Sequence, residues 1–528
     1  MSEENLMSFV TRRAFIRNLA IGAGALALPQ AVTGRAFAAG ASELVWGKKI
    51  EATMYDPATS ILASSWELLH TIYEGLVDLD ADLKPVPGVA ESWTQPSPAE
   101  YVFTIHKGVK FSNGRELTVD DVVGSLTRLI NPKTGSFFGG QMGPITAIEA
   151  AGDNKVRIAL KTPYAPLLTA LSSTMASILP MKELAAGGFD PSKAFLGSGP
   201  YMVESHTQGD KWVLARNPNY WRQGQPTFDR LVVRIIPNDN ALIAALRDGS
   251  VQVAQFDASP DAKLLLGAVK NVEIVQNQQS NLFWLMLNAV APNSPFGHAK
   301  VRQAVALAVD RPRIAKIAMG GNGAPSSSMA PLFAACDTSK LGYFNRDVNR
   351  AKSLLAEAGQ KSLSFELITG AEPAWQAISQ VLKESFAEAG ITVNIVTVDE
   401  GTMVKRVWID QPGNFQAALG WYAGYSDPAM IPLWFVPKAA GFTGGYQIEE
   451  ADVVTAVTNL RAMAADDPAR PKALQDVASM LDAQANQIPL ITRVETMAFR
   501  ADLVDASGIR HKDGYADNLY GVGAYKAR

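Results

Sequence analysis

The segment from Ser364 to Val398 constrains the fold more than any other part of this chain. Phe365 to Thr369 has the composition of a strand, and the stretch after Gly390 alternates apolar and polar side chains as a second strand. Between the two strands, apolar side chains recur at helical spacing: Trp375, Ile378, Leu382, Phe386 and Ala389. A strand–helix–strand unit of this length predicts two parallel strands joined by a right-handed crossover. The sequence therefore indicates an α/β architecture.

The chain has 528 residues, which is too long for one hydrophobic core, so two or three lobes are expected. Ser64 to Leu76 is predicted to be a helix, and Thr118 to Asp121 a capping box that starts a helix ending at Ile130. Residues 60–195 should form a small α+β subdomain. We predict lobe one at 43–283 plus 495–528 and lobe two at 284–494, with hinge strands near 283–288 and 488–496.

The N-terminus is typical of an export signal. Thr11 to Arg17 matches the twin-arginine pattern, and Leu19 to Leu28 is a short apolar region. Ala36, Phe37 and Ala38 fit the small-x-small rule, so residues 1–38 are predicted to be a signal peptide cleaved after Ala38. The alternative is an amphipathic or anchoring N-terminal helix, which Gly22 and Gly24 would weaken and Pro29 would end.

Charge and composition exclude several classes of protein. The formal net charge is −3 and 19% of residues are charged, which gives no nucleic-acid or polybasic membrane signature. The five histidines are scattered without metal-ligand spacing, and no nucleophile elbow, phosphate loop or dinucleotide motif is present. We therefore expect neither an enzyme nor a cofactor. Cys336 is alone, so it forms no intrachain disulfide; it is either a reactive thiol or a small half-buried side chain.

Several segments resemble, in order, the extracellular solute-binding protein family 5, the peptide, nickel and opine receptors of ABC importers. They are Ile72 to Val77 with Pro85 to Trp93, Phe103 to Asp121, Gly197 to Tyr201, Asn217 to Trp221, and Asn281 to Arg311. The resemblance implies a two-lobed periplasmic binding protein of the large cluster-C type, with an additional small α+β subdomain in lobe one. Arg302 and Arg311 fall in motif positions and are expected to be structural.

The same resemblance implies a function. A periplasmic receptor of this family encloses its solute between the lobes and hands it to ABC permease subunits in the inner membrane, without chemistry. We expect a monomer that binds a peptide or amino-acid derivative. An opine or an oligosaccharide-like solute is the alternative, and a sensor or chaperone use of the same fold also stays open.

The resemblance also places a ligand loop at Trp421 to Trp434. Peptide-binding relatives often carry an aspartate where this chain has Gly424, and dipeptide binders use an arginine in the loop that corresponds to 370–373, where none occurs. Aromatic side chains, which pack on rings and apolar chains, remain. The candidate ligand-binding residues are Trp421, Tyr422, Tyr425, Asp427, Glu372 and Trp375.

Each of these candidates has a structural alternative. Asp427 could brace its own loop through a bond to the backbone. The aromatic candidates could pack in the core, which is the expected role of Trp375 on the apolar face of a predicted helix, whereas Tyr422 and Tyr425 in the loop are expected to contact the ligand. Glu372 could meet a cationic group of the ligand or only complement the dipole of the helix that follows it.

Overall fold

The computed structural model describes residues 42–80, 82–256, 262–267, 269–329, 335–422, 425–440, 443–505, 512–513 and 522–527. The predicted signal peptide lies outside these ranges. The described residues belong to one compact unit, and none of their helices is long and apolar enough to cross a membrane. The helices are α2 (Ala63–His70), α3 (Val119–Ile130), α4 (Leu167–Leu171), α5 (Met181–Ala185), α6 (Asp239–Asp248), α7 (Ala262–Leu266), α8 (Ala299–Ala308), α9 (Arg311–Ala318), α10 (Val348–Glu357), α11 (Pro373–Glu388), α12 (Glu400–Val404), α13 (Pro437–Ala440), α14 (Ala451–Ala462) and α15 (Arg470–Gln484).

A large mixed sheet organises the chain. Its strands follow the order β14, β13, β15, β12, β16, β11, β1, β10, β9 and β8, and the short β18 pairs with β12. Their bounds are β14 (Ile391–Thr397), β13 (Leu363–Thr369), β15 (Ala417–Tyr422), β12 (Val272–Leu287), β16 (Gln487–Arg500), β11 (Val253–Phe256), β1 (Glu43–Lys48), β10 (Arg230–Ile235), β9 (Lys211–Arg216), β8 (Tyr201–Thr207) and β18 (Lys512–Asp513).

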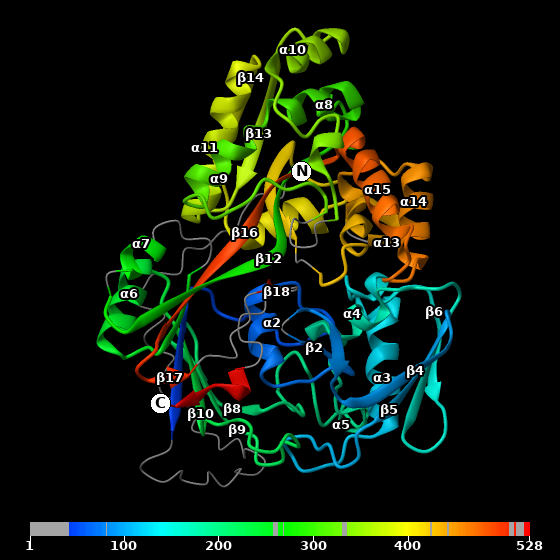
Figure 1. The fold of residues 1–528 in the computed structure, drawn as a ribbon, viewed down its shortest axis with the longest axis vertical. Coiled ribbons are helices and arrows are strands. Elements are labelled where there is room, and N and C mark those ends of the chain that lie inside the picture. Colours follow the sequence, from blue (N-terminus) through cyan, green and yellow to red (C-terminus); the bar gives the residue numbers. More distant parts are fainter. Residues whose placement is uncertain are drawn as a thin grey trace, which may run out of the picture. The chain divides into compact units, whose positions relative to one another are not determined.

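Two long strands, β12 and β16, form the centre of this sheet (Figure 1). They pair antiparallel along most of their length. The second half of β12 also pairs with β15, and the second half of β16 with β11. The ribbon of β12 and β16 thus carries two strand groups, which we call group A (β1, β8, β9, β10 and β11) and group B (β13, β14 and β15).

The predicted strand–helix–strand unit is present in group B. β13 and β14 pair in parallel from Leu363 with Ile391 to Thr369 with Thr397, and α11 connects them. Gly390 has a φ of 78°, a backbone conformation that a residue with a side chain rarely adopts, and it ends the connection. The α/β class predicted from this unit is therefore confirmed.

A second, four-stranded antiparallel sheet has the order β4 (Ala90–Ser97), β5 (Glu100–Ile105), β7 (Lys155–Leu160) and β6 (Ile145–Ala150). Two small ribbons pair β2 (Val77–Leu79) with β3 (Pro85–Pro87) and β17 (Val504–Asp505) with β19 (Lys526–Ala527). The four-stranded sheet and α3 lie within the range predicted for the α+β subdomain. The predicted lobe boundaries, 43–283 plus 495–528 for lobe one and 284–494 for lobe two, remain a prediction.

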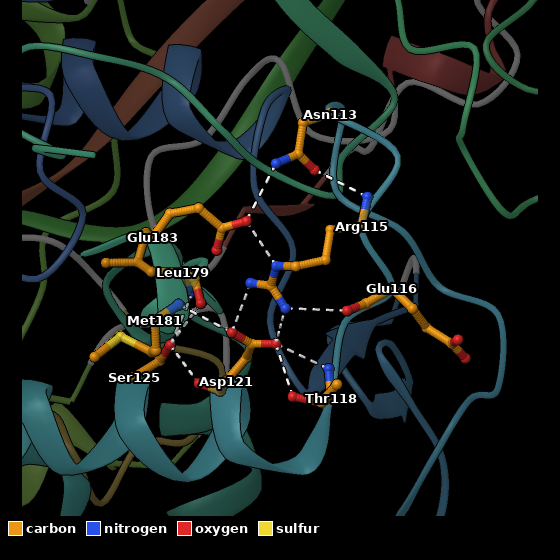
Figure 2. Close-up of polar contacts among 9 residues, drawn as sticks. All are labelled: Asn113, Arg115, Glu116, Thr118, Asp121, Ser125, Leu179, Met181 and Glu183. Atoms are coloured by element: carbon orange, nitrogen blue, oxygen red, sulfur yellow. Dashed lines mark hydrogen bonds and ion pairs between the residues drawn. The ribbon is translucent and has the colours of Figure 1, made fainter. Parts of the chain in front are cut away.

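The start of α3 is held by the capping box that the sequence predicted. Thr118 is the N-cap, and the backbone N–H of Thr118 donates to Asp121 Oδ2 over 2.9 Å. Arg115 donates from Nη1 and Nη2 to the same carboxylate, over 2.8 and 2.9 Å, and from Nε to Glu183 Oε1 over 2.7 Å. Asn113 also donates to Glu183 (Figure 2). This Arg115 cluster ties the loop before α3 to α3 and α5.

The helix predicted from Ser64 to Leu76 was too long, because α2 ends at His70. The hydroxyl of Thr71 donates back to the carbonyl oxygen of Leu68 over 2.7 Å, which closes the last turn. Beyond it, a Cβ added at Gly75 would stand 2.8 Å from the carbonyl oxygen of Leu171. Any side chain at this position would clash with that carbonyl group, so glycine lets the chain after α2 pass this close to another backbone.

The two arginines of the family motif are structural, as expected. Buried Arg302 donates to the carbonyl oxygens of Gln484 and Phe296, over 2.8 and 2.9 Å. Arg311 donates to the carbonyl oxygens of Pro489 and Phe344, and burial lowers the pKa of Arg311 to about 10. Both side chains fasten helices α8 and α9 to backbone far along the chain.

Candidate ligand-binding site

A cavity of about 590 Å³ lies where the walls of group A and group B meet. Its lining comes from β1, the start of α2 and β11 on one side, and from the β13–α11 loop, the start of α12 and β15 on the other. β16 contributes from the central ribbon. Pockets of this size, with apolar walls and a few polar groups, are the usual form of small-molecule sites.

Aromatic side chains make up much of the cavity wall. They are Trp66, Phe137, Trp375, Trp408, Trp421 and Trp434. Trp375 stands edge-on to Phe283, with ring centroids 5.8 Å apart, so one part of its ring packs on the core and another part faces the cavity. Such rings present flat apolar surfaces to a solute.

A chain of ionic groups runs through the wall from group A to the central ribbon. Lys48 and Glu67 form a buried ion pair. Gln255 Nε2 donates to Glu67 over 2.8 Å and to Glu495 over 3.3 Å. Arg493 pairs with Glu495 over 2.9 Å, and its guanidinium lies 4.5 Å above the ring centre of Trp421. We call this chain, from Lys48 to Arg493, the ionic chain.

The group B side of the cavity carries acidic groups. Glu372 is the N-cap position of α11 but makes no capping hydrogen bond with its side chain. Asp399 is the N-cap of α12 and accepts from the backbone N–H and the hydroxyl of Thr402. Glu400 follows, and burial together with the negative charge of Glu372 raises the pKa of Glu400. We call Glu372 and Glu400 the acidic pair.

The predicted site residues fall into separate places. Trp421, Trp375 and Glu372 line the cavity. Tyr425 does not: it is 1% exposed and packs on Trp434 within the core, with ring centroids 5.8 Å apart. The side chain of Tyr422 and the loop position of Gly424 lie outside the described residues.

Asp427 also lies away from the cavity lining. Its carboxylate accepts from the backbone N–H of Ala429 over 2.8 Å and from Arg470 over 2.5 Å. Because the ion pair is buried and the backbone bond is local, Asp427 has the bracing arrangement that was its structural alternative.

The sequence did not point to the ionic chain or to Glu400. Lys48, Gln255, Arg493 and Glu495 come from three different strands, and no local spacing relates them. A usable signal was present only in 487–500, where charged residues interrupt an otherwise buried apolar strand. Charge at such a position favours a polar site over core packing.

No group of three or more histidine, cysteine or acidic residues in the described part of the chain could hold a metal ion. Cys336 is half-buried, and burial raises the pKa of its thiol. A raised thiol pKa reduces the reactive thiolate. The side chain packs against a core cluster.

The chain is similar to known solute-binding proteins. The family model described as "Bacterial extracellular solute-binding proteins, family 5 Middle" matches residues 84–443. A relative described as probable D,D-dipeptide-binding periplasmic protein DdpA, from Escherichia coli (strain K12), is 29% identical over 435 residues, which cover 78% of this chain and 81% of the relative. Glutathione-binding protein GsiB of Salmonella choleraesuis (strain SC-B67) is 27% identical over 392 residues, or 72% of this chain and 75% of the relative.

Solved structures share the fold. The binding protein AgaA from A. tumefacien R10, in complex with agropinic acid, has a TM-score of 0.81 at 23% identity and covers 92% of this chain and 99% of its own. The oligopeptide-binding protein AppA from Bacillus subtilis, in complex with a nonapeptide, has a TM-score of 0.80 at 22% identity over the same shares of the two chains. The family match spans well over half of the sequence. This chain belongs to the bacterial extracellular solute-binding proteins, family 5.

Proposed function

We propose that this protein is the periplasmic substrate-binding component of an ABC importer, which captures a peptide or amino-acid-derived solute and delivers it to the membrane permease. The observation that carries the proposal is the cavity, whose walls come from both strand groups. A solute that touches both groups stabilises the conformation in which they are closest, so capture needs no chemistry.

The exposed apolar side chains at the cavity agree with such a closing motion. Ile50 follows β1 of group A and is 38% exposed, while Ile409 follows α12 on the group B side and is 64% exposed. Large apolar side chains that remain exposed in the lining lose contact with water when a solute or the facing wall covers them. We expect small-angle scattering to show a lower radius of gyration with saturating solute, and an unchanged radius would contradict closure.

The chemistry of the walls suits an amino-acid derivative. Acidic and basic groups both line the cavity, which matches solutes that carry charges of both signs. The names of the relatives, a D,D-dipeptide-binding and a glutathione-binding protein, also favour a peptide. The six aromatic rings leave an opine or an oligosaccharide-like solute as the second candidate, because such rings pack against sugar faces.

The cellular address is part of the same proposal. We propose that residues 1–38 direct export by the twin-arginine route, with cleavage after Ala38, and that the mature protein is a monomer. The description of DdpA as a periplasmic protein supports this compartment.

The proposal is tested by thermal unfolding of residues 40–528 against di- to pentapeptides, opines and small oligosaccharides. A solute at a hundred times its dissociation constant adds about 2.7 kcal/mol to the free energy of unfolding. A shift by peptides alone supports the main proposal, and a shift by opines or oligosaccharides alone replaces it with the second candidate. If no member of the panel shifts the melting temperature, the proposed solute classes are wrong.

The contribution of the cavity is tested with Trp421→Ala. Loss of an aromatic face that contacts the solute should weaken its binding at least tenfold, or about 1.4 kcal/mol, by calorimetry. Trp93→Ala is the control, because Trp93 is a partly exposed tryptophan in the four-stranded sheet, outside the cavity lining. Equal affinities of the two variants would remove Trp421 from the binding site.

A further inference from the structure

Two parts of the chain that connect to different strand groups contact each other outside the cavity lining. The predicted subdomain, 60–195, is inserted between β1 and β8, so both of its covalent connections lead to group A. The chain between β15 and β16, 423–486, connects group B to the central ribbon. The contacts between these two insertions are therefore tertiary. A movement that separates group A from group B has to break them, unless the subdomain stays behind with group B.

Three interactions join Tyr164 and Ala165 of the subdomain to Arg461, in the last turn of α14. Arg461 Nη2 donates to Tyr164 Oη over 2.7 Å, and its guanidinium carbon lies 4.6 Å from the centre of the tyrosine ring. The backbone N–H of Ala165 donates to the carbonyl oxygen of Arg461 over 3.0 Å. Tyr164 is 2% exposed, and its hydroxyl donates to the carbonyl oxygen of Gln141 over 2.6 Å. The oxygen that accepts from Arg461 is thus held in place from the subdomain side.

The charge of Arg461 is not matched by an acid. Among the described residues Arg461 forms no ion pair, and its Nε is buried without a hydrogen-bond partner. Arg470, by contrast, pairs with Asp427 inside the same insertion. The contact of a cation with a phenol and an aromatic ring is weaker than a buried ion pair. Separation also returns Nε of Arg461 to water, so this contact can break at a moderate cost in free energy.

Two smaller contacts cross between the same insertions. Ser426 Oγ donates to Thr169 Oγ1 in α4 over 3.2 Å. A Cβ added at Gly140, in the 3-10 helix Gly139–Met142, would stand 2.5 Å from the carbonyl oxygen of Ala439 in α13. The φ of Gly140 is not positive, so the close approach, rather than the backbone conformation, favours glycine here. None of the residues in these contacts lines the cavity, so the contacts act apart from the solute.

We propose that the Tyr164–Arg461 contact is a latch, which forms when the two walls of the cavity approach each other and breaks when they separate, so that the chain itself stabilises the closed conformation. The inference deepens the receptor function proposed above, because it adds a part of closure that does not depend on the solute. A contact that is present in only one of two conformations shifts their populations by its own free energy. The solute then has less of the closing free energy to supply.

The test is small-angle scattering of residues 40–528 without solute. Arg461→Met keeps an apolar stem but removes the guanidinium, and Tyr164→Phe removes only the hydroxyl that accepts from it. Both variants should populate the open conformation more and therefore show a larger radius of gyration than the parent protein. Arg461→Met should have the larger effect, and the double variant should match it, because both substitutions remove the same hydrogen bond.

Arg350→Met is the matched control. The guanidinium carbon of Arg350 lies 5.1 Å from the ring centre of Tyr343, so the same two side-chain types meet, but both lie within predicted lobe two. This variant should keep the radius of gyration of the parent protein. If the Arg461 and Tyr164 variants keep it too, or if Arg350→Met increases it equally, the contact is permanent packing and the latch is wrong.

Hydrogen exchange of the parent protein decides the inference where a variant loses its native circular dichroism. The amide of Ala165 bonds across the latch to Arg461, whereas the amide of exposed Lys161, in the same loop, donates to the carbonyl oxygen of Pro144 within the subdomain over 2.8 Å. Opening of the latch frees the first amide and not the second, so Ala165 should exchange roughly tenfold faster, although Lys161 is the more exposed residue. Equal exchange, or faster exchange at Lys161, would overturn the inference.

Neither measurement uses a solute, so failure of the latch is distinguishable from failure of the receptor proposal. If a peptide, an opine or an oligosaccharide raises the melting temperature of the parent protein while the latch variants keep its radius of gyration, the receptor function stands and only the latch is wrong. If none of these solutes does so while the radius increases as expected, the latch stands and the proposed solute classes are wrong.

Discussion

Asp121 and Glu183 meet around one guanidinium, whereas Glu372 and Glu400 lie close together with no basic side chain paired to either in the described part of the chain. Burial by itself would raise the pKa of Asp121, but hydrogen bonds from Arg115 and Thr118 outweigh it and hold that pKa below its ordinary value (Figure 2). Partial desolvation in the cavity wall and the negative charge of Glu372 raise the pKa of Glu400 above its ordinary value, although this residue is exposed. Carboxylates thus stabilise the framework around Arg115. At the cavity, Glu372 and Glu400 have no ion-pair partner among the described residues.

The difference shows which charges the fold needs for itself. A carboxylate that fixes a loop to a helix is given a partner from the same chain, because an uncompensated buried charge lowers stability. Glu372 and Glu400 are exposed at the cavity, where water solvates their charges, so the fold can leave them without a paired cation at little cost.

The largest expected effect comes from removing the partner in the Arg115 cluster. Arg115→Met keeps most of the apolar stem but leaves Asp121, whose side chain is 2% exposed, without its guanidinium. We expect the free energy of unfolding to fall by about 3 kcal/mol in denaturant titrations. Arg157→Met, which removes an arginine paired with Glu100 and Glu149 on an exposed sheet face, is the control and should cost much less. Similar losses in both variants would show that the Arg115 cluster has no special role.

An intermediate effect is expected at Gln255. Its amide nitrogen donates two hydrogen bonds, while its Oε1 has no hydrogen-bond partner among the described residues. Gln255→Leu removes the donor that both Glu67 and Glu495 accept from, so the free energy of unfolding should fall by about 2 kcal/mol. The control is Gln380→Leu, because Gln380 also donates to a glutamate, Glu384, but on an exposed helix face. Its loss should be only about 0.3 kcal/mol. If thermal unfolding finds Gln255→Leu as stable as the control, the bridge between the two glutamates does not contribute to folding.

The smallest expected effect is a gain in the free energy of unfolding rather than a loss. Because folding raises the pKa of Glu400, the folded protein binds this proton more tightly than the unfolded chain does. Stability of the solute-free protein therefore falls as the pH rises from the ordinary glutamate pKa through the raised one. Glutamine does not titrate, so Glu400→Gln should match the parent protein at about pH 4 and exceed it at neutral pH. Cavity water screens this site, so the gain stays below about 1 kcal/mol.

The measurement is the melting temperature as a function of pH without solute. Glu357→Gln serves as the control and should show no gain at neutral pH, because its carboxylate already has Lys300. A Glu400→Gln variant that is less stable than the parent at neutral pH would mean that Glu400 has a stabilising partner.

The sequence predicted most of the framework, for local reasons. The alternation of β13 and β14, the helical spacing in α11 and the capping box of α3 depend on residues that are near in the chain, and all are present in the structure. The predicted site was less complete. Trp421, Trp375 and Glu372 line the cavity, but Tyr425 packs in the core and Asp427 braces its loop on Arg470.

By itself, the sequence determined the α/β class and the family, because these follow from periodicity and from motifs of neighbouring residues. Only the tertiary structure decided which charges face the cavity. Lys48, Gln255, Glu400 and Arg493 come together from segments that are far apart in the chain, when β1, β11, α12 and β16 are brought around one space. Ion pairing within the ionic chain, and its absence at Glu372 and Glu400 among the described residues, are properties of that arrangement. Electrostatic partners are set by distance in space rather than by position in the sequence.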